Sequence, residues 1–190
     1  MRVKIGICVT LIGLATGFLF NCYANRRWRQ SHVLNIIIPV IIFWLLHQKF
    51  GLSLDSLKGF IFSLLLLYAA NSDLYTREVT NWVPFSIILI GLIGVELSVI
   101  IQKLFAAILI TLPQLIIAVR YPNRYGGGDI KVSAACAFVL GIERGIIGLI
   151  TGLFLAIVCT FCNQKVENRK IEAIPLIPYL ATGFILAYII

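Results

Sequence analysis

Apolar residues recur along this chain in long runs that short polar connections separate. An α-helix needs roughly 17–25 apolar residues to cross a bilayer core about 30 Å thick. The runs predict eight membrane segments, at residues 5–24, 33–47, 57–72, 82–101, 104–120, 132–142, 145–163 and 174–190. The second and sixth are short, and the sixth is not expected to span fully. We therefore predict an all-α, polytopic membrane helical bundle, with a single membrane-embedded domain over residues 1–190 and no separable soluble module.

The composition agrees with this pattern. Hydrophobic residues make up 60% of the chain and charged residues 13%, whereas soluble proteins carry about 25% charged residues. The net charge of +8 could suggest a nucleic-acid partner. However, the basic residues are scattered between the apolar segments, which is typical of topology determinants facing membrane lipid rather than of a phosphate-binding surface. We expect no nucleic-acid partner.

The distribution of basic residues predicts the orientation, because cytoplasmic connections are enriched in Lys and Arg. With the N-terminus outside, ten of the 16 basic residues fall inside and six outside. The inner ones are Arg26, Arg27, Arg29, Arg77, Arg120, Arg124, Lys131, Lys165, Arg169 and Lys170. The outer ones are Arg2, Lys4, Lys49, Lys58, Lys103 and Arg144. Each markedly basic connection therefore lies on one side, which supports the eight-segment topology.

Residues 1–24 also have features of a signal peptide, with a basic start, an apolar centre and Ala24 as a small residue near a possible cleavage point. Arg26, Arg27 and Arg29 follow at once and would resist translocation. Removing the segment would also reverse the parity of the topology. We expect it to be retained.

The three aspartates are divided by this topology. Asp73 follows the third segment and Asp129 precedes the sixth, so both lie at the cytoplasmic face, whereas Asp55 lies on the opposite side. A charge at the bilayer centre costs roughly 2.5–3.5 kcal/mol, so carboxylates at a membrane segment are usually functional. Asp73 and Asp129 are the candidate catalytic residues.

Two neighbouring carboxylates cannot both ionise easily, and they share a proton. One can then act as a general base on a water while the other donates a proton to a peptide carbonyl. Such an aspartic protease needs no metal and no cofactor, and we expect neither. His32 and His47 are too few for a metal cluster, and the CxxC pair Cys159 and Cys162 lacks a second pair, so these cysteines are best explained as small buried apolar residues.

Gly126, Gly127 and Gly128 precede Asp129 directly. Because glycine tolerates positive φ and has no Cβ, this loop could admit a substrate backbone close to Asp129 and move toward Asp73. Lys131 is better placed to meet lipid phosphates or to orient the loop than to pair with Asp129. These residues form the predicted active-site loop.

Structural roles are the alternative for each of these polar residues. Asp129 would be a favoured N-cap for a helix beginning near Ile130, and Asn81 a cap for the helix that starts the fourth segment. Glu96, late in the fourth segment, is best explained as a residue of the outer interface. Gly148 and Gly152 form a small-xxx-small pair suited to close helix packing.

Four segments carry a family resemblance. The segment from Gly126 to Lys131 resembles the GxGDxK motif of type IV prepilin peptidases, and the segment from Asp73 to Asn81 is similar to the first aspartate region of that family. The segments 13–21 and 174–180 are similar to its N-terminal Gly-Ser-Phe-Leu-Asn and C-terminal Ile-Pro-Phe-Gly-Pro-Phe stretches. The matches occur in the expected order and run through nearly the whole chain.

The resemblance implies an intramembrane aspartic protease of GxGD type, with Asp73 and Asp129 as the catalytic pair. It implies cleavage of the leader of a type IV prepilin or pseudopilin, after a glycine at the cytoplasmic end of the substrate helix. It also implies a bacterial cytoplasmic membrane and a role in pilus assembly or protein secretion. Many members carry an insertion after the first segment with paired CxxC motifs and also methylate the new N-terminus. Here that connection is only residues 25–32 and has no cysteine pair, so we expect peptidase activity without N-methylation.

Two other functions fit the same aspartates. One is a GxGD protease of the presenilin or signal-peptide-peptidase kind, although the first aspartate there usually follows tyrosine, whereas Ser72 precedes Asp73 here. The other is a non-enzymatic transporter or membrane assembly factor that uses the aspartates as proton or cation sites.

Overall fold

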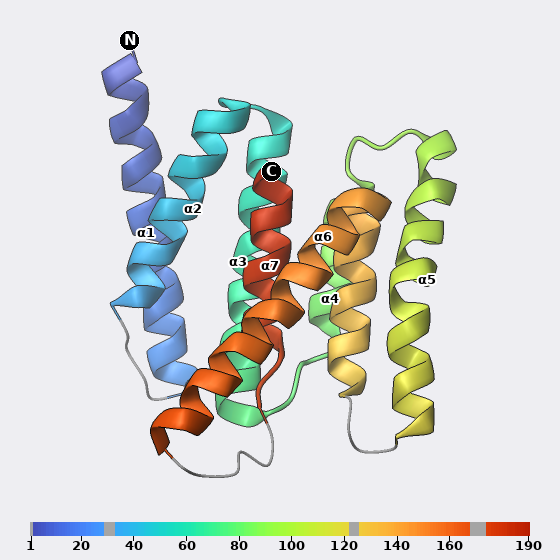
Figure 1. The fold of residues 1–190 in the computed structure, drawn as a ribbon. Coiled ribbons are helices and arrows are strands. Elements are labelled where there is room, and N and C mark those ends of the chain that lie inside the picture. The colour runs from blue at the N-terminus through green and yellow to red at the C-terminus, as the bar shows by residue number, and fades with distance from the viewer. Residues whose placement is uncertain (1, 29–32, 122–125, 168–173) are drawn as a thin grey trace. The chain divides into compact units, whose positions relative to one another are not determined.

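The fold is that of a computed structural model, which describes residues 2–28, 33–121, 126–167 and 174–190. In these ranges the chain forms seven α-helices and no strand (Figure 1), which confirms the all-helical prediction. They are α1 (Arg2–Trp28), α2 (Leu34–Phe50), α3 (Leu54–Thr76), α4 (Trp82–Leu92), α5 (Leu97–Arg120), α6 (Gly127–Glu167) and α7 (Ile177–Ile189). The predicted determinants Arg29, Arg124, Arg169 and Lys170, together with His32 and Tyr125, lie outside the described residues.

Among the residues that the structure describes, three helices are long and apolar enough to cross a membrane: α3, α5 and the part of α6 from Gly127 to Cys162. The helices α2, α4 and α7 are apolar but shorter. Large apolar side chains are exposed along the long helices, as in Leu97, Ile101 and Val119 of α5 and Ile157 of α6. Apolar surface on this scale is stable against lipid and not against water, so the chain is a membrane protein.

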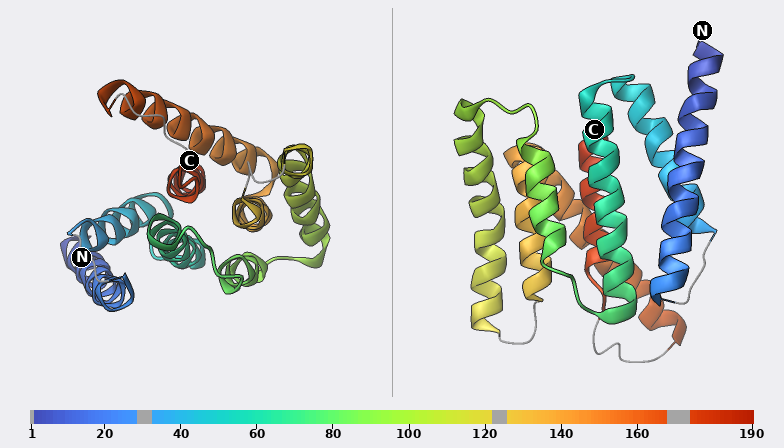
Figure 2. Two further views of the ribbon diagram at one scale, coloured as in Figure 1. Left: turned by 90° about the horizontal axis from the view of Figure 1, so that it is seen from below. Right: turned by 180° about the vertical axis from the view of Figure 1, so that it is seen from behind.

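The chain falls into two compact units, residues 1–64 and residues 65–188. In the first unit α1 packs along α2 (Figure 2), and two glycines permit a close approach. A Cβ at Gly17 would lie 2.6 Å from the carbonyl oxygen of Ile36, and one at Gly13 would lie 2.9 Å from the Cα of Val40. Larger residues at either position would force the two helices apart.

The second unit contains both candidate aspartates. Here α4 and α5 pack against α6, and α7 packs on the later part of α6. Gly148 and Gly152 meet α7 at Phe184 and Leu180, and a Cβ on Gly183 of α7 would clash with the backbone of both glycines. The predicted small-xxx-small packing at Gly148 and Gly152 is confirmed.

A sharp kink divides α6 at Gly141, whose φ of 80° and ψ of −174° lie far from helical values. A Cβ on Gly145 would stand 3.4 Å from the Cα of Ala137, which shows that the chain turns back on itself there. The two parts diverge from the kink in Figure 1. The predicted sixth and seventh segments are thus joined by a single non-helical residue.

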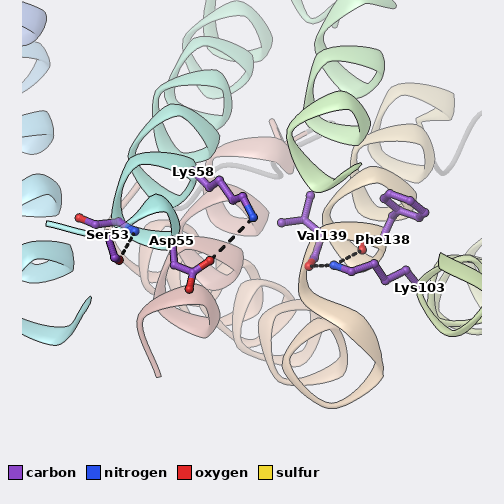
Figure 3. Close-up of polar contacts among 7 residues, drawn as sticks. Ser53, Asp55, Lys58, Lys103, Phe138 and Val139 are labelled. Atoms are coloured by element: carbon purple, nitrogen blue, oxygen red, sulfur yellow. Dashed lines mark hydrogen bonds and ion pairs between the residues drawn. The ribbon is translucent and has the colours of Figure 1, made fainter. Parts of the chain in front are cut away.

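The kink leaves helix-terminal carbonyl groups without their usual partners, and Lys103 of α5 binds them. Its Nζ donates to the carbonyl oxygens of Val139 at 2.9 Å and of Phe138 at 3.4 Å (Figure 3). The ammonium group also lies over the aromatic ring of Phe138, 5.9 Å from the ring centroid, within the range of a cation–π contact. A cation at a helix C-terminus is favourable, and here it stabilises the turn in α6.

The predicted fourth segment, residues 82–101, is wrong at its end. The helix α4 stops at Leu92, Gly94 adopts a φ of 64°, and α5 begins at Leu97. Glu96 therefore occupies the N-cap position of α5 rather than the late part of a membrane helix, and its carboxylate accepts a hydrogen bond from Ser98 Oγ at 3.5 Å.

Candidate functional site

Asp73 lies in the last turn of α3, and its side chain is buried. Its Oδ2 accepts a hydrogen bond of 3.1 Å from the backbone N–H of Ile177, the first residue of α7. The first N–H groups of a helix have no partner within the helix. At the start of α7, Pro178 has no N–H, and the N–H groups of Tyr179 and Leu180 bind the Leu176 carbonyl oxygen. The Asp73 carboxylate thus binds the amide of Ile177, although the two residues are 104 positions apart in sequence.

Side-chain hydroxyl groups fix the turn that follows Asp73. Ser72 Oγ donates to the carbonyl oxygen of Glu78 at 2.8 Å. Thr76 Oγ1 donates to the Ser72 carbonyl oxygen at 2.7 Å and also lies 3.2 Å from the Glu78 oxygen. Arg77 takes a positive φ of 55°, and its N–H donates to the Asp73 carbonyl oxygen at 3.1 Å, which ends the helix. The positive charge of Arg77 also acts on the Asp73 carboxylate.

Asp129 is half-buried in the first turn of α6. The helix begins at Gly127 rather than near Ile130, so Asp129 is its third residue and not its N-cap, contrary to the predicted alternative. Its backbone N–H donates to the Gly126 carbonyl oxygen at 3.1 Å, and its carboxylate accepts a hydrogen bond from the Gly126 N–H. An acidic third residue that reaches back to the cap amide is one half of a capping box.

The three glycines before Asp129 do not have the backbone conformation that we predicted. Positive φ among the described glycines occurs at Gly51, Gly94 and Gly141, not at Gly126, Gly127 or Gly128. Glycine is required instead where a side chain would have no room. A Cβ on Gly126 would lie 2.8 Å from Asp129 Oδ2, whereas one on Gly127 would meet nothing within 4 Å and one on Gly128 would make an ordinary contact of 3.5 Å with Val79 Cβ.

Lys131 connects the helix that carries Asp129 with the segment that follows Asp73. Its Nζ donates a hydrogen bond of 2.9 Å to Oδ1 of Asn81. Asn81 stands at the N-cap position of α4, but its side chain makes no capping hydrogen bond, so the predicted cap is wrong. The Asn81 side chain therefore binds Lys131 of α6 rather than a backbone amide of its own helix.

The two aspartates face one cleft of about 330 Å³ within the second unit. They are close enough for the charge of Asp73 to act on Asp129. The cleft is lined by Asp73, Arg77, Glu78, Val79, Asn81, Gly126, Gly127, Gly128, Asp129, Lys131 and Ile177. All six residues predicted for the site therefore line the same space.

Asp55 is not among the residues of the cleft. It lies in the first turn of α3, exposed, with Oδ1 3.8 Å from Lys58 Nζ. Asp73 follows 18 positions later in the same helix, which separates the two by about 27 Å at a rise of 1.5 Å per residue. The division of the three aspartates into a pair and an outlier agrees with the arrangement of the structure.

Arg77 and Ile177, which both act on the Asp73 carboxylate, were not predicted as site residues from the sequence. Arg77 carried no signal for its role, because neither its positive φ nor its place in the cleft follows from a charged residue after a helix. Ile177 had a partial signal: Pro178 is favoured at the start of a helix, which places the free amide of α7 at Ile177. Which group would bind that amide could not be read from the sequence.

The cysteines Cys22, Cys136, Cys159 and Cys162 are free. Cys136 is buried, but Cys159 is half-buried and Cys162 is exposed, so the prediction that the CxxC pair is buried is wrong. Within the described ranges no group of three or more His, Cys, Asp or Glu side chains gathers in one place. The expectation of a reaction without a metal or cofactor remains a prediction about the chemistry.

Comparison with known proteins gives one match. The model of the type IV leader peptidase family matches residues 60–161, more than half of the chain and a range that contains both Asp73 and Asp129. No curated protein and no solved structure matches the chain. The chain belongs to the type IV leader peptidase family, a family of membrane proteases.

Proposed function

We propose that this protein is an aspartic endopeptidase of GxGD type that removes the leader peptide of type IV prepilins or pseudopilins. The observation that carries the proposal is the cleft that Asp73 and Asp129 both line, one from the end of α3 and the other from the start of α6. In this proposal residues 1–190 form one membrane-embedded peptidase domain with eight membrane segments, when α6 is counted as two.

The cleft contains the groups that peptide hydrolysis requires. One carboxylate, in its ionised form, takes a proton from a water, whose oxygen attacks the scissile carbonyl carbon. The other, in its protonated form, donates its proton to the carbonyl oxygen. When the tetrahedral intermediate collapses, the C–N bond breaks, the first carboxyl group gives its proton to the leaving amine, and the second carboxylate takes a proton from a hydroxyl of the intermediate, so the pair returns to its starting state. Like charges held close together favour this sharing of a single proton.

The substrate fits the position of the pair. Both aspartates stand at ends of apolar helices, where a substrate helix in the membrane would present its polar leader. The basic residues Arg77 and Lys131 line the same cleft, as the positive-inside rule expects for a cytoplasmic surface. We therefore place the protein in a bacterial cytoplasmic membrane, with the active site toward the cytoplasm and a prepilin or pseudopilin helix as its partner.

The reaction stops at peptide cleavage in this proposal. The connection between the first two segments, residues 25–32, contains no cysteine pair that could form the insertion found in methylating members. Purified protein incubated with S-adenosylmethionine and a mature pilin should transfer no methyl group. Methyl incorporation above that of the same mixture without the protein would refute this part.

The deciding experiment is coexpression with a candidate prepilin from the same genome, followed by mass spectrometry of the prepilin N-terminus. Asp73→Asn and Asp129→Asn should each reduce cleavage by about 10²–10⁴-fold, because each removes a proton-transfer group. Asp55→Asn is the matched control and should cleave normally. Unchanged processing in both site variants would refute the mechanism. Loss of ion transport without any peptide product would favour the transporter alternative, and cleavage within the substrate helix rather than at the leader would favour the other GxGD proteases.

A further inference from the structure

The segment that follows Asp73 and the start of α6, which carries Asp129, contact each other at two points beside the cleft. Gly128 of the α6 segment approaches Val79, with a distance of 3.5 Å from a Cβ built on Gly128 to Val79 Cβ. Two residues after Val79 and three after Gly128, Lys131 Nζ binds Asn81 Oδ1 at 2.9 Å. Residues 79–81 and residues 128–131 thus run together along one wall of the cleft.

Asn81 forgoes a stabilising role to make this contact. Asparagine is among the best N-cap residues, and its replacement at such a position typically destabilises the helix. Asn81 stands at the N-cap position of α4, yet it has φ −61° and ψ −19°, and no capping hydrogen bond from its side chain. Its amide oxygen is directed to Lys131 instead. A side chain diverted from the local bond that its residue type favours indicates a requirement elsewhere.

Each end of the contact is rigidly connected to one aspartate. Asn81 follows a turn that Ser72 and Thr76 fix through the Glu78 carbonyl oxygen, and Ser72 is the immediate neighbour of Asp73. Lys131 is in the first turns of α6, two residues after Asp129. A bond between Asn81 and Lys131 therefore constrains the position of one carboxylate relative to the other.

We propose that Asn81 and Lys131 are a positioning pair that sets the separation of the two catalytic carboxylates. The inference rests on the proposed peptidase function. Neither side chain donates or accepts a proton in the reaction. Their hydrogen bond joins the start of α4, which follows the turn after Asp73, to the first turns of α6. It limits how far the Asp129 carboxylate can move relative to the Asp73 carboxylate and so sets the spacing between them. Reactions between oriented groups are sensitive to this spacing, and a displacement of about 1 Å can cost about 10²-fold in rate.

The test is a double-mutant cycle in the full-length protein, reconstituted in detergent with a candidate prepilin from the same genome. The variants are Asn81→Leu, Lys131→Met and the double substitution, with Lys131→Arg as the conservative variant and Lys58→Met as an unrelated lysine control. We expect each single substitution to lower kcat about tenfold while KM changes less than about twofold, because orientation rather than binding is lost. The double variant should lose no more than either single variant, because both remove one interaction.

Lys131→Arg can still donate to Asn81 and should retain kcat within about threefold of the unmodified protein, and Lys58→Met should be unaffected. Measuring the unfolding temperature of each variant separates a misplaced carboxylate from a misfolded protein, and the comparison of Lys131→Arg with Lys131→Met decides the matter if Asn81→Leu fails to fold. Independent losses that multiply in the double variant would overturn the inference, as would an increase in KM at constant kcat, which indicates substrate or lipid binding by Lys131. In those cases Asp73→Asn and Asp129→Asn remain inactive and the proposed function stands. Cleavage that survives both aspartate substitutions would overturn the function and this inference with it.

Discussion

The two aspartates share a cleft but are held in different ways. Asp73 is buried, and its carboxylate binds the amide of Ile177, which begins a helix 104 residues later. Asp129 is half-buried, and its carboxylate binds the amide of Gly126, three residues earlier. One position depends on the assembly of α3 with α7, and the other depends on a single turn of backbone.

This difference predicts which substitutions should change the stability of the fold and which should change mainly the position of a carboxylate. Changes at Asp73 affect contacts between distant elements, so they should alter folding as well as reaction rate. Changes around Asp129 affect a local turn at an exposed end of a helix, so they should alter the reaction with little effect on folding. The predictions below test this distinction.

The largest expected difference in stability concerns the acceptor at each position. At Asp73, leucine should be less stable than asparagine by about 1–3 kcal/mol, because asparagine still accepts a bond from Ile177 and leucine leaves a buried N–H unpaired. At Asp129 the same comparison should give less than about 1 kcal/mol, because Gly126 is exposed and its amide can bind water. Unfolding in detergent, followed by circular dichroism, measures both differences. Comparing leucine with asparagine cancels the common effect of removing the charge, and equal values at the two positions would contradict the distinction.

The next largest effect concerns the glycines. Gly126→Ala should lower kcat by about 10–100-fold, because the new Cβ stands 2.8 Å from Asp129 Oδ2 and must displace the carboxylate. Gly127→Ala is the matched control, since a Cβ there meets nothing within 4 Å, and it should leave cleavage unchanged. It should also stabilise α6 slightly, because alanine is favoured over glycine in a helix by up to about 1 kcal/mol. Equal activity of the two variants would show that space beside Asp129 is not the reason for glycine.

The smallest effect concerns the turn after Asp73. Ser72→Ala should cost about 0.5–1.5 kcal/mol, because the Thr76 hydroxyl, which donates to the Ser72 carbonyl oxygen, can turn to the Glu78 carbonyl oxygen 3.2 Å away. Combining Ser72→Ala with Thr76→Val removes both donors, so the loss should exceed the sum of the two single losses.

The control for this turn is Thr111→Val in α5, where the hydroxyl donates to a carbonyl oxygen of its own helix. It should change stability less than the double variant. Additive losses at Ser72 and Thr76 would show that the two hydroxyls do not act on a shared carbonyl.

Much of this arrangement could be predicted from the pattern of apolar residues. Helical class follows from the length of the runs, and the order of segments along the chain brings Asp73 and Asp129 to one place while excluding Asp55. The breaks within apolar stretches were harder to predict. The run from Trp82 to Ile101 contains Gly91 and Gly94, and glycine in a membrane segment is compatible with both packing and chain reversal. Only the structure shows that Gly94 takes positive φ and separates α4 from α5.

Side-chain partners could not be predicted for a different reason. Asn81 and Asp129 are both favourable capping residues, and the sequence offers a local role for each. The structure instead pairs Asn81 with Lys131 and places Asp129 inside its helix. Interactions between distant segments decide which of two allowed bonds a polar side chain makes, and those interactions depend on the assembled fold.

The kink at Gly141 has a consequence for the surrounding lipid. The part of α6 before it, residues 127–140, has a length of only about 21 Å at 1.5 Å per residue, and α7, with 13 residues, reaches about 20 Å. A hydrocarbon core is about 30 Å thick, and a protein with shorter apolar elements thins the bilayer around it at a cost that grows with each ångström of mismatch. The two helix starts that carry the Asp129 carboxylate and the Ile177 amide would then lie where the membrane is locally compressed and water is nearest. The acyl-chain length of the surrounding lipids should therefore affect this protein, because it sets the mismatch between bilayer thickness and helix length.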